Sequence, residues 1–167
     1  MNIVVSALVV VHPDGQRLLM VRKSGTTSFM LPGGKPEPGE SAVQAIVREI
    51  AEELGLALDP VDLEELGTWT AQAANEAGFS VTGTVFLHDG IPDGLDVEDP
   101  QVLEEIEEAG WFPWDALPAD TPARQFAFLT RDHVIPHLRK RLRARSVQAP
   151  RDSTPGYWAS DKAERAR

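Results

Sequence analysis

Hydrophobic positions in the first third of the chain form continuous runs and then a helical repeat. Residues 2–11 are almost all aliphatic and mostly β-branched, and residues 18–21 form a second run after the turn at residues 13–15. Such runs predict buried strands, and the turn between them predicts a hairpin. Residues 29–31 predict a short extended segment.

A helix is predicted directly after the glycine- and proline-rich residues 33–39. Ser41 and Gln44 have the spacing of a capping box, and Gly55 stands where a C-cap glycine is expected. Between them, apolar residues recur every three or four positions, as in a helix with one buried face; they are Val43, Ile46, Val47, Ile50 and Leu54.

Further along, residues 61–63, 66–70 and 79–88 predict strands, and the turn at residues 75–78 predicts a second hairpin. Residues 89–108 are acidic and interrupted by prolines, so we expect a mobile loop there. A short strand follows at residues 111–114.

The pattern from residue 124 onward predicts a second helix, with an N-cap at Thr121, Pro122 at its first turn and a bend near Pro136. The tail, residues 143–167, is polar and partly basic. We expect one α+β domain over residues 1–142, an α/β/α sandwich with a mixed β-sheet flanked by helices.

Composition narrows the function. Of the 167 residues none is cysteine, which excludes disulfides and thiolate chemistry and fits a cytoplasmic protein. Residues 1–138 hold 7 Lys and Arg against 23 Asp and Glu. So acidic a body argues against nucleic-acid binding. The apolar start lacks the basic region of a signal peptide and suits a buried strand, so no membrane association is expected. A homodimer is compatible with the sequence.

The predicted helix carries three carboxylates on one flank, from Glu49, Glu52 and Glu53. Like charges at this spacing repel each other, so a folded protein that keeps them together needs a counter-charge. Carboxylates are the ligands that Mg²⁺ and Mn²⁺ prefer, commonly together with substrate phosphates. The glycine loop and the helix therefore predict metal-dependent phosphate chemistry.

These residues also resemble a known family. Residues 34–56, from Gly34 through Glu40 to the segment Arg48-Glu49-Ile50-Ala51-Glu52-Glu53-Leu54-Gly55-Leu56, resemble the Nudix box of MutT-type Nudix hydrolases at every defined position. Residues 29–34 also resemble the segment that leads into that box. The resemblance implies the same sandwich fold and a hydrolase that acts on phosphoric anhydrides.

By position, the resemblance makes Glu49, Glu52 and Glu53 metal ligands, with Gly34 contributing its carbonyl oxygen. It makes Glu49 alternatively the base that accepts the proton of water, and Arg48 the residue that orients the carboxylates. A further catalytic acid is expected in the loop before the late strand. Glu105 is the candidate, and Glu104 and Glu108 are alternatives.

Substrate-binding residues are less well marked. Arg22 and Lys23 end the second predicted strand and could meet a phosphate, although a cation there is more often simply exposed. Phe29 could stack on a base or fill the core. Gly33 of the glycine loop is the fourth candidate for substrate binding.

The sequence thus predicts a Mg²⁺-dependent pyrophosphohydrolase, with Mn²⁺ as the alternative metal, that acts on a small nucleotide. A nucleoside triphosphate, ordinary or oxidised, is the first choice, because the markers of other subgroups are missing. ADP-ribose or another nucleoside diphosphate derivative is the first alternative. A non-catalytic nucleotide-binding regulator is the alternative from another class.

Overall fold

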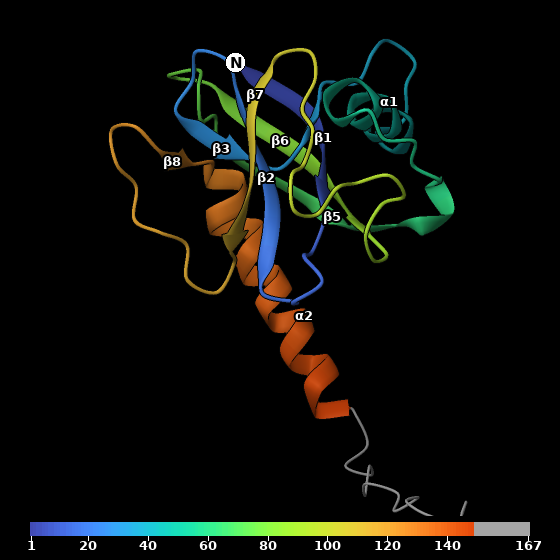
Figure 1. Ribbon diagram of the computed structural model, residues 1–167. Helices are drawn as coiled ribbons and strands as arrows, with labels where there is room; N and C mark the ends of the chain where they lie inside the picture. Colours follow the sequence, from blue (N-terminus) through green and yellow to red (C-terminus); the bar gives the residue numbers. More distant parts are fainter. Residues whose placement is uncertain (149–167) are drawn as a thin grey trace, which may run out of the picture.

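The computed structural model describes residues 1–148, which form two β-sheets and two main helices (Figure 1). The strands are β1 (Asn2–Val9), β2 (Arg17–Lys23), β3 (Ser28–Met30), β4 (Gly33–Gly34), β5 (Leu63–Gln72), β6 (Ser80–His88), β7 (Ile106–Pro113) and β8 (Gln125–Phe126). The helices are α1 (Ala42–Leu54), a 3₁₀ turn η1 (Pro60–Asp62), a π-helical segment η2 (Leu129–Val134) and α2 (Ile135–Gln148).

The strands pair as β4-β1-β6-β5 in one sheet and β7-β2-β3-β8 in the other. β1 runs parallel to β6, and β5 and β6 form the second predicted hairpin. The first predicted hairpin is wrong in its pairing. β1 and β2 lie in different sheets, and antiparallel pairing is confined to the turn that joins them. There, Val11 and Leu18 form a bridge, His12 N donates to Arg17 O and Leu19 N donates to Val10 O.

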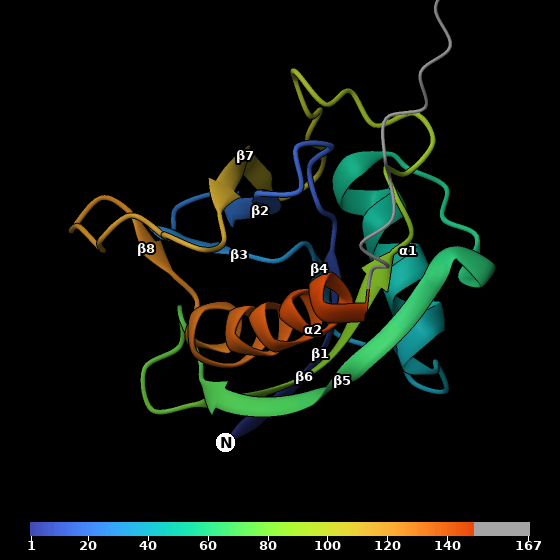
Figure 2. The same ribbon diagram turned by 90° about the horizontal axis from the view of Figure 1, so that it is seen from below.

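α1 and α2 cover opposite sides of the central strands (Figure 2). Along β1, Ala7 and Val9 pack in the core that includes α2, whereas Leu8 and Val10 pack in the core that includes α1. Leu18 of β2 belongs to the first core and its neighbour Leu19 to the second. A strand that is buried on both faces has a continuous run of apolar residues in its sequence. This is why β1 and β2 could be predicted from the sequence. The α+β class with helices on both sides is confirmed, with two sheets in place of one.

The C-terminal helix begins later than predicted. Thr121 and Arg124 close a small turn and bridge instead of capping a helix. The chain then adds β8 and enters η2, whose end is marked by a hydrogen bond from Ile135 N–H to Thr130 O, five residues back. Pro136 has no N–H and its ring crowds the preceding turn, so a wider π turn accommodates it.

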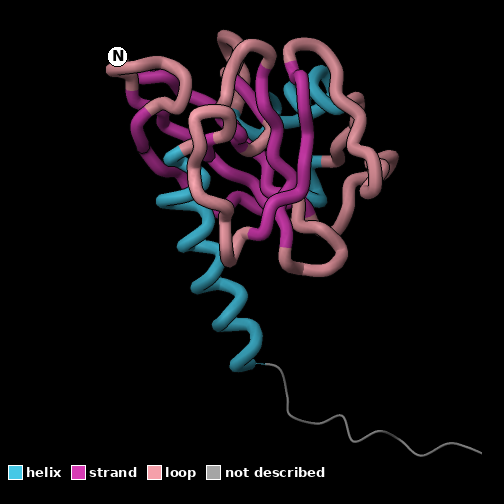
Figure 3. The backbone as a smooth tube through the Cα atoms, turned by 60° about the vertical axis from the view of Figure 1, so that its left-hand side comes forward, coloured by secondary structure: helices cyan, strands magenta, loops and turns pink. Residues whose placement is uncertain are grey.

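Two other boundaries differ from expectation. Residues 61–62 lie in η1, because Asp59 caps a 3₁₀ turn that precedes β5. Residues 106–108 of the predicted loop belong to β7, where they pair with β2. The predicted domain boundary at residue 142 falls inside α2, which extends beyond the body of the protein (Figure 3). Residues 149–167 of the predicted tail lie outside the described residues, so the boundary stays a prediction.

Within residues 1–148, no helix is long and apolar enough to cross a membrane.

Candidate active site

Local signals fix the register of α1. Ser41 Oγ accepts a hydrogen bond from Gln44 N at 3.2 Å, and Gln44 Oε1 accepts one from Ser41 N at 2.9 Å, which completes the predicted capping box. Gly55 ends the helix with φ 66°, a left-handed conformation that glycine adopts without strain. These two ends determine where the carboxylates of α1 point.

The glycine pair before α1 brings the backbone against the helix. Gly33 and Gly34 form β4 and pair with Ala7 and Ser6 of β1. Gly33 has φ 140°, and a Cβ atom on it would lie 2.1 Å from the carbonyl oxygen of Ser6. A Cβ atom on Gly34 would lie 2.4 Å from the carboxylate of Glu49. The absence of side chains therefore lets β4 approach both β1 and α1.

Glu53 points inward, unlike most glutamates on a helix. Its exposed fraction is 1%, and its Oε2 accepts a hydrogen bond of 2.9 Å from Gly33 N. Its Oε1 is buried without a hydrogen-bond partner in the described part of the chain. Burial raises the pKa of Glu53 to about 7; the Gly33 N–H and the charge of Lys23 oppose this rise, and the charges of Glu49 and Glu105 add to it.

Arg48 links the carboxylates to the glycine loop. Its guanidinium donates two hydrogen bonds to Glu40, at 2.9 and 3.0 Å, one to Glu49 at 3.0 Å and one to Glu52 at 3.2 Å. A fifth bond, of 3.0 Å, reaches the carbonyl oxygen of Lys35. The hydrogen bonds from Arg48 also lower the pKa of Glu40. Arg48 thus has the geometry to orient Glu49, as the sequence predicted.

Lys23 and Glu105 meet above the carboxylates of α1. A β-bulge between Arg22 and Lys23 ends the regular pairing of β2 with β7. Lys23 Nζ forms an ion pair with Glu105 Oε1, and Ser24 N donates a 2.9 Å hydrogen bond to the carbonyl oxygen of Glu105. Leu103 N donates to the carbonyl oxygen of Glu53 at 2.8 Å. The loop that carries Glu105 is therefore attached to both β2 and α1.

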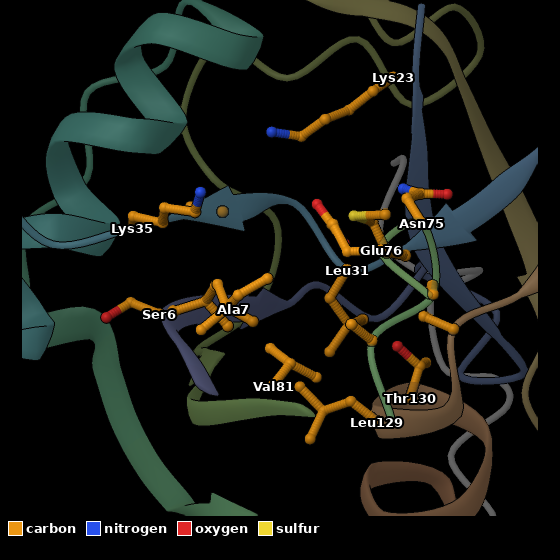
Figure 4. Close-up of a pocket in the computed structure, with 18 of the residues that line it drawn as sticks. Ser6, Ala7, Lys23, Leu31, Lys35, Asn75, Glu76, Val81, Leu129 and Thr130 are labelled. Atoms are coloured by element: carbon orange, nitrogen blue, oxygen red, sulfur yellow. The ribbon is translucent and has the colours of Figure 1, made fainter. Parts of the chain in front are cut away.

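These elements line a cavity of about 440 Å³ (Figure 4). Its charged part contains Lys23, Lys35, Glu49 and Glu105 together with the Gly33–Gly34 backbone. Most of the remaining wall is apolar; it includes Ile3, Val5, Ala7, Met30, Leu31, Val81, Ala127 and Leu129. Its polar residues are Ser6, Gln72, Asn75, Glu76 and Thr130. In Figure 4, Lys23 lies across the cavity from Val81 and Leu129. The cavity thus has a charged end and an apolar end.

Two predicted substrate-binding residues lie away from this cavity. Arg22 forms ion pairs with Glu107 at 2.8 Å and Glu108 at 3.0 Å, and it donates a hydrogen bond to the carbonyl oxygen of Thr26. Phe29 has an exposed fraction of 3% and contacts the rings of Phe112 and Phe126. Arg22 therefore joins β2 to β7 and to the loop after β2. Phe29 fills the core, which was the alternative to stacking on a base.

Some cavity residues were not anticipated from the sequence. Ser6 lines the cavity with its hydroxyl buried and without a hydrogen-bond partner among the described residues, and Thr130, also buried, lines it from η2. Ser6 interrupts the apolar run of residues 3–11, and a polar residue in a buried strand could have been a signal. Thr130 gave no such signal, because its place depends on the π-helical segment.

The carboxylate and carbonyl oxygens at and beside the charged end are of the type that binds a divalent cation. Within residues 1–148 no group of three or more His, Asp or Glu side chains already converges to hold an ion, because Glu52 turns outward to Arg48 and Glu53 turns inward to Gly33. Glu52 and Glu53 are not among the residues that line the cavity. The orphaned Oε1 of Glu53 and the close approach of Gly34 to Glu49 nevertheless supply hard oxygen atoms beside a tight backbone.

Comparison with known proteins agrees with this geometry. The family described as the NUDIX domain matches residues 2–132. The chain is 32% identical over 126 residues to the mouse 8-oxo-dGDP phosphatase NUDT18, which covers 74% of this chain and 36% of that protein. It is 31% identical over 154 residues to the NAD-capped RNA hydrolase NudC of Stutzerimonas stutzeri. That match covers 90% of this chain and 48% of NudC. The chain thus spans less than half the length of these two relatives.

Among solved structures, a MutT NUDIX hydrolase from Burkholderia pseudomallei is 27% identical, with a TM-score of 0.59. The match covers 80% of this chain and 98% of that one. The relatives are named as hydrolases or phosphatases, in agreement with the activity class expected from the sequence. Because the family matches across both sheets, α1 and the cavity, this chain belongs to the NUDIX family.

Proposed function

We propose that the protein is a metal-dependent pyrophosphohydrolase that cleaves a nucleoside triphosphate, ordinary or oxidised, to the monophosphate and pyrophosphate. The observation that carries the proposal is the two-ended cavity. Its charged end carries Lys23, Glu49, Glu105 and the Gly33–Gly34 backbone, and the rest of its wall is largely apolar. A nucleotide has the same division between an anionic phosphate chain and a flat base of low polarity.

The charged end suits phosphates only if cations accompany them, because carboxylates alone would repel the substrate. A bound Mg²⁺ or Mn²⁺ would neutralise phosphate oxygens and make a water molecule more acidic. Glu53 and Glu49 are the residues proposed to hold it, with Glu52 and the carbonyl oxygen of Gly34 as further ligands. The orphaned Oε1 of Glu53 supports this assignment.

The chain's own residues have separate parts in the proposed reaction. Lys23 binds a phosphate oxygen, Arg48 holds Glu49 in place, and the carboxylate of Glu49 or of Glu105 accepts the proton of the attacking water. Water adds to a phosphorus atom, and the bond from that phosphorus to the bridging oxygen breaks. The bridging oxygen departs with the leaving group, which is pyrophosphate if water adds to the α phosphorus and the nucleoside monophosphate if it adds to the β phosphorus.

The base is proposed to lie at the apolar end, between Leu31 on one side and Val81 and Leu129 on the other. Aliphatic walls of this kind bind any flat base, so hydrogen bonds to the base edge must supply the selectivity. Of the polar residues on this wall, which include Gln72 and Asn75, we expect the hydroxyl of Thr130 to serve this role, because Thr130 adjoins Leu129.

The test is a substrate panel with Glu53→Gln as the catalytic variant. Nucleoside triphosphates, oxidised dGTP, ADP-ribose and dinucleotide polyphosphates are incubated with Mg²⁺, and released phosphate is measured after a coupling pyrophosphatase or phosphatase. Glutamine can still accept the hydrogen bond from Gly33 N, so the variant should fold. Glu65→Gln, an exposed residue of β5, is the matched control.

We expect triphosphates to be hydrolysed, the Glu53→Gln rate to fall by a factor of 100 or more, and the control to match the wild type. Turnover of ADP-ribose alone would overturn the triphosphate assignment. Binding of nucleotides without turnover of any of them would overturn the hydrolase assignment and favour a nucleotide-binding regulator.

A further inference from the structure

Lys23 lies among the carboxylates on which the proposed function depends. Its side chain has an exposed fraction of 29%, forms an ion pair with Glu105 and lines the same cavity as Glu49. Burial by itself would lower the pKa of Lys23, but the contact with Glu105 and the charges of Glu53 and Glu49 outweigh burial and raise it. The ammonium is therefore held in the field of three carboxylates.

Lys35 also lines the cavity, but the two arginines near the site are bound to other groups. Arg48 donates hydrogen bonds to Glu40, Glu49, Glu52 and the Lys35 carbonyl oxygen. It donates none to Glu53 or Glu105. Arg22, the neighbour of Lys23, is bound to Glu107 and Glu108. The charge of Lys23 acts on Glu53 and opposes the rise of its pKa.

We propose that Lys23, paired with Glu105 in the cavity that Glu49 also lines, is an internal counter-ion of the metal-free protein and is displaced when a divalent cation binds. This inference rests on the proposed function, because it assumes that Glu49 and Glu53 hold the metal. Lys23 contacts Glu105, and the charges of Glu49 and Glu53 also act on it. A divalent cation beside these carboxylates would repel the ammonium, so each cation weakens the binding of the other. Metal binding then frees the ammonium for a phosphate oxygen of the substrate.

The side-chain type suits such an exchange. Lysine carries a compact charge on four flexible carbons, so it can move from one anion to another by rotating its side chain, whereas arginine would be held by its planar fork. The bulge at Arg22 and Lys23 frees the end of β2 from the regular register. The same residue can therefore stabilise the metal-free state and serve the substrate-bound state.

The test measures metal binding directly. Binding of Mn²⁺ to metal-free protein is measured by isothermal titration calorimetry for the wild type, Lys23→Met and Lys23→Arg. Lys140→Met on the exposed surface of α2 is the control for removing one positive charge elsewhere. Thermal unfolding of each variant is recorded with and without Mn²⁺, and Lys23→Gln repeats the test should the methionine variant not fold.

We expect Lys23→Met to bind Mn²⁺ between about threefold and tenfold more tightly than the wild type, following the removal of a competing charge. We also expect the metal-free melting temperature of Lys23→Met to fall, and the increase in its melting temperature on adding Mn²⁺ to be larger than in the wild type. The Kd of Lys23→Arg and of Lys140→Met for Mn²⁺ should stay within twofold of the wild-type value. Unchanged or weaker Mn²⁺ binding in Lys23→Met would overturn the inference and leave the proposed function standing. If the wild type binds no Mn²⁺ and hydrolyses no nucleotide, both fall.

Discussion

Gly34 and the carboxylate of Glu49 are in such close contact that a single added carbon would not fit between them. A Cβ atom on Gly34 would lie 2.4 Å from the Glu49 carboxylate carbon. The obstructing group is the end of a flexible side chain, so Gly34→Ala should fold with a small loss of stability. The displaced carboxylate should lower kcat at least tenfold, as measured with the best substrate of the panel.

Gly33→Ala is the informative contrast to that variant. Its Cβ would lie 2.1 Å from the backbone oxygen of Ser6, and φ at this position is 140°. Because backbone must move, we expect a loss of about 2 kcal/mol or more in the free energy of unfolding, measured in urea. If Gly33→Ala and Gly34→Ala were equally stable, the contrast between a backbone obstruction at Gly33 and a side-chain obstruction at Gly34 would be wrong.

Arg48 should not be replaceable by lysine. Its five hydrogen bonds go to three carboxylates and the Lys35 carbonyl oxygen, and a single ammonium cannot make them together. We expect Arg48→Lys to lose a factor of 10 to 100 in kcat. Arg141→Lys is the matched control, because Arg141 has the same side-chain exposure of 23% and pairs with Glu64 outside the cavity. A loss of activity in both variants would argue against a specific role for Arg48.

Glu53 should make the metal-free protein less stable as pH rises. Its pKa is about 7 in the folded protein against an ordinary 4.5, so between these values the folded state binds more protons than the unfolded state. The stabilising contribution of this group is therefore complete below pH 4.5. It falls by about 3 kcal/mol in total as pH rises to 7 and is then constant. Urea unfolding of Glu53→Gln in a chelating buffer should show a smaller decline over that range. An identical pH profile for wild type and variant would refute the assignment.

Glu104 should tolerate glycine better than valine. It is the one residue other than glycine with positive φ in the described part of the chain, at 51°. It occupies the first central position of the turn that ends with Ile106 N donating to Leu103 O. We expect Glu104→Gly to keep activity and to match or exceed wild-type stability by up to about 1 kcal/mol, and Glu104→Val to lose about 1–2 kcal/mol. Greater stability of the valine variant in urea would contradict the argument.

The parts of the fold that the sequence predicted correctly are those determined by residues close together in the chain. The capping box of Ser41 and Gln44 and the C-cap at Gly55 each involve neighbours within one helical turn. The error at Thr121 has a local origin as well. Its hydroxyl accepts the Arg124 N–H at 3.1 Å, the bond expected of an N-cap, but the bond closes a turn instead of opening a helix.

The sequence predicted which candidate residues of α1 lie together, but not the residues that surround them. Arg48 and the α1 carboxylates share one helix, so their proximity followed from spacing. The ion pair of Lys23 with Glu105 joins residues 82 positions apart, and no local pattern indicates it. The ring contacts that place Phe29 in the core likewise depend on β7 and β8, which come much later in the chain.

The parallel pairing of β1 with β6 has a consequence for how the protein is made. β1 lies between β4 and a partner that begins 78 residues after it, so most of the domain must leave the ribosome before the first strand can complete its sheet. Until then, two long apolar segments lack their neighbours and are open to wrong association. High contact order of this kind slows folding, which makes early chaperone binding to β1 and β2 advantageous during synthesis.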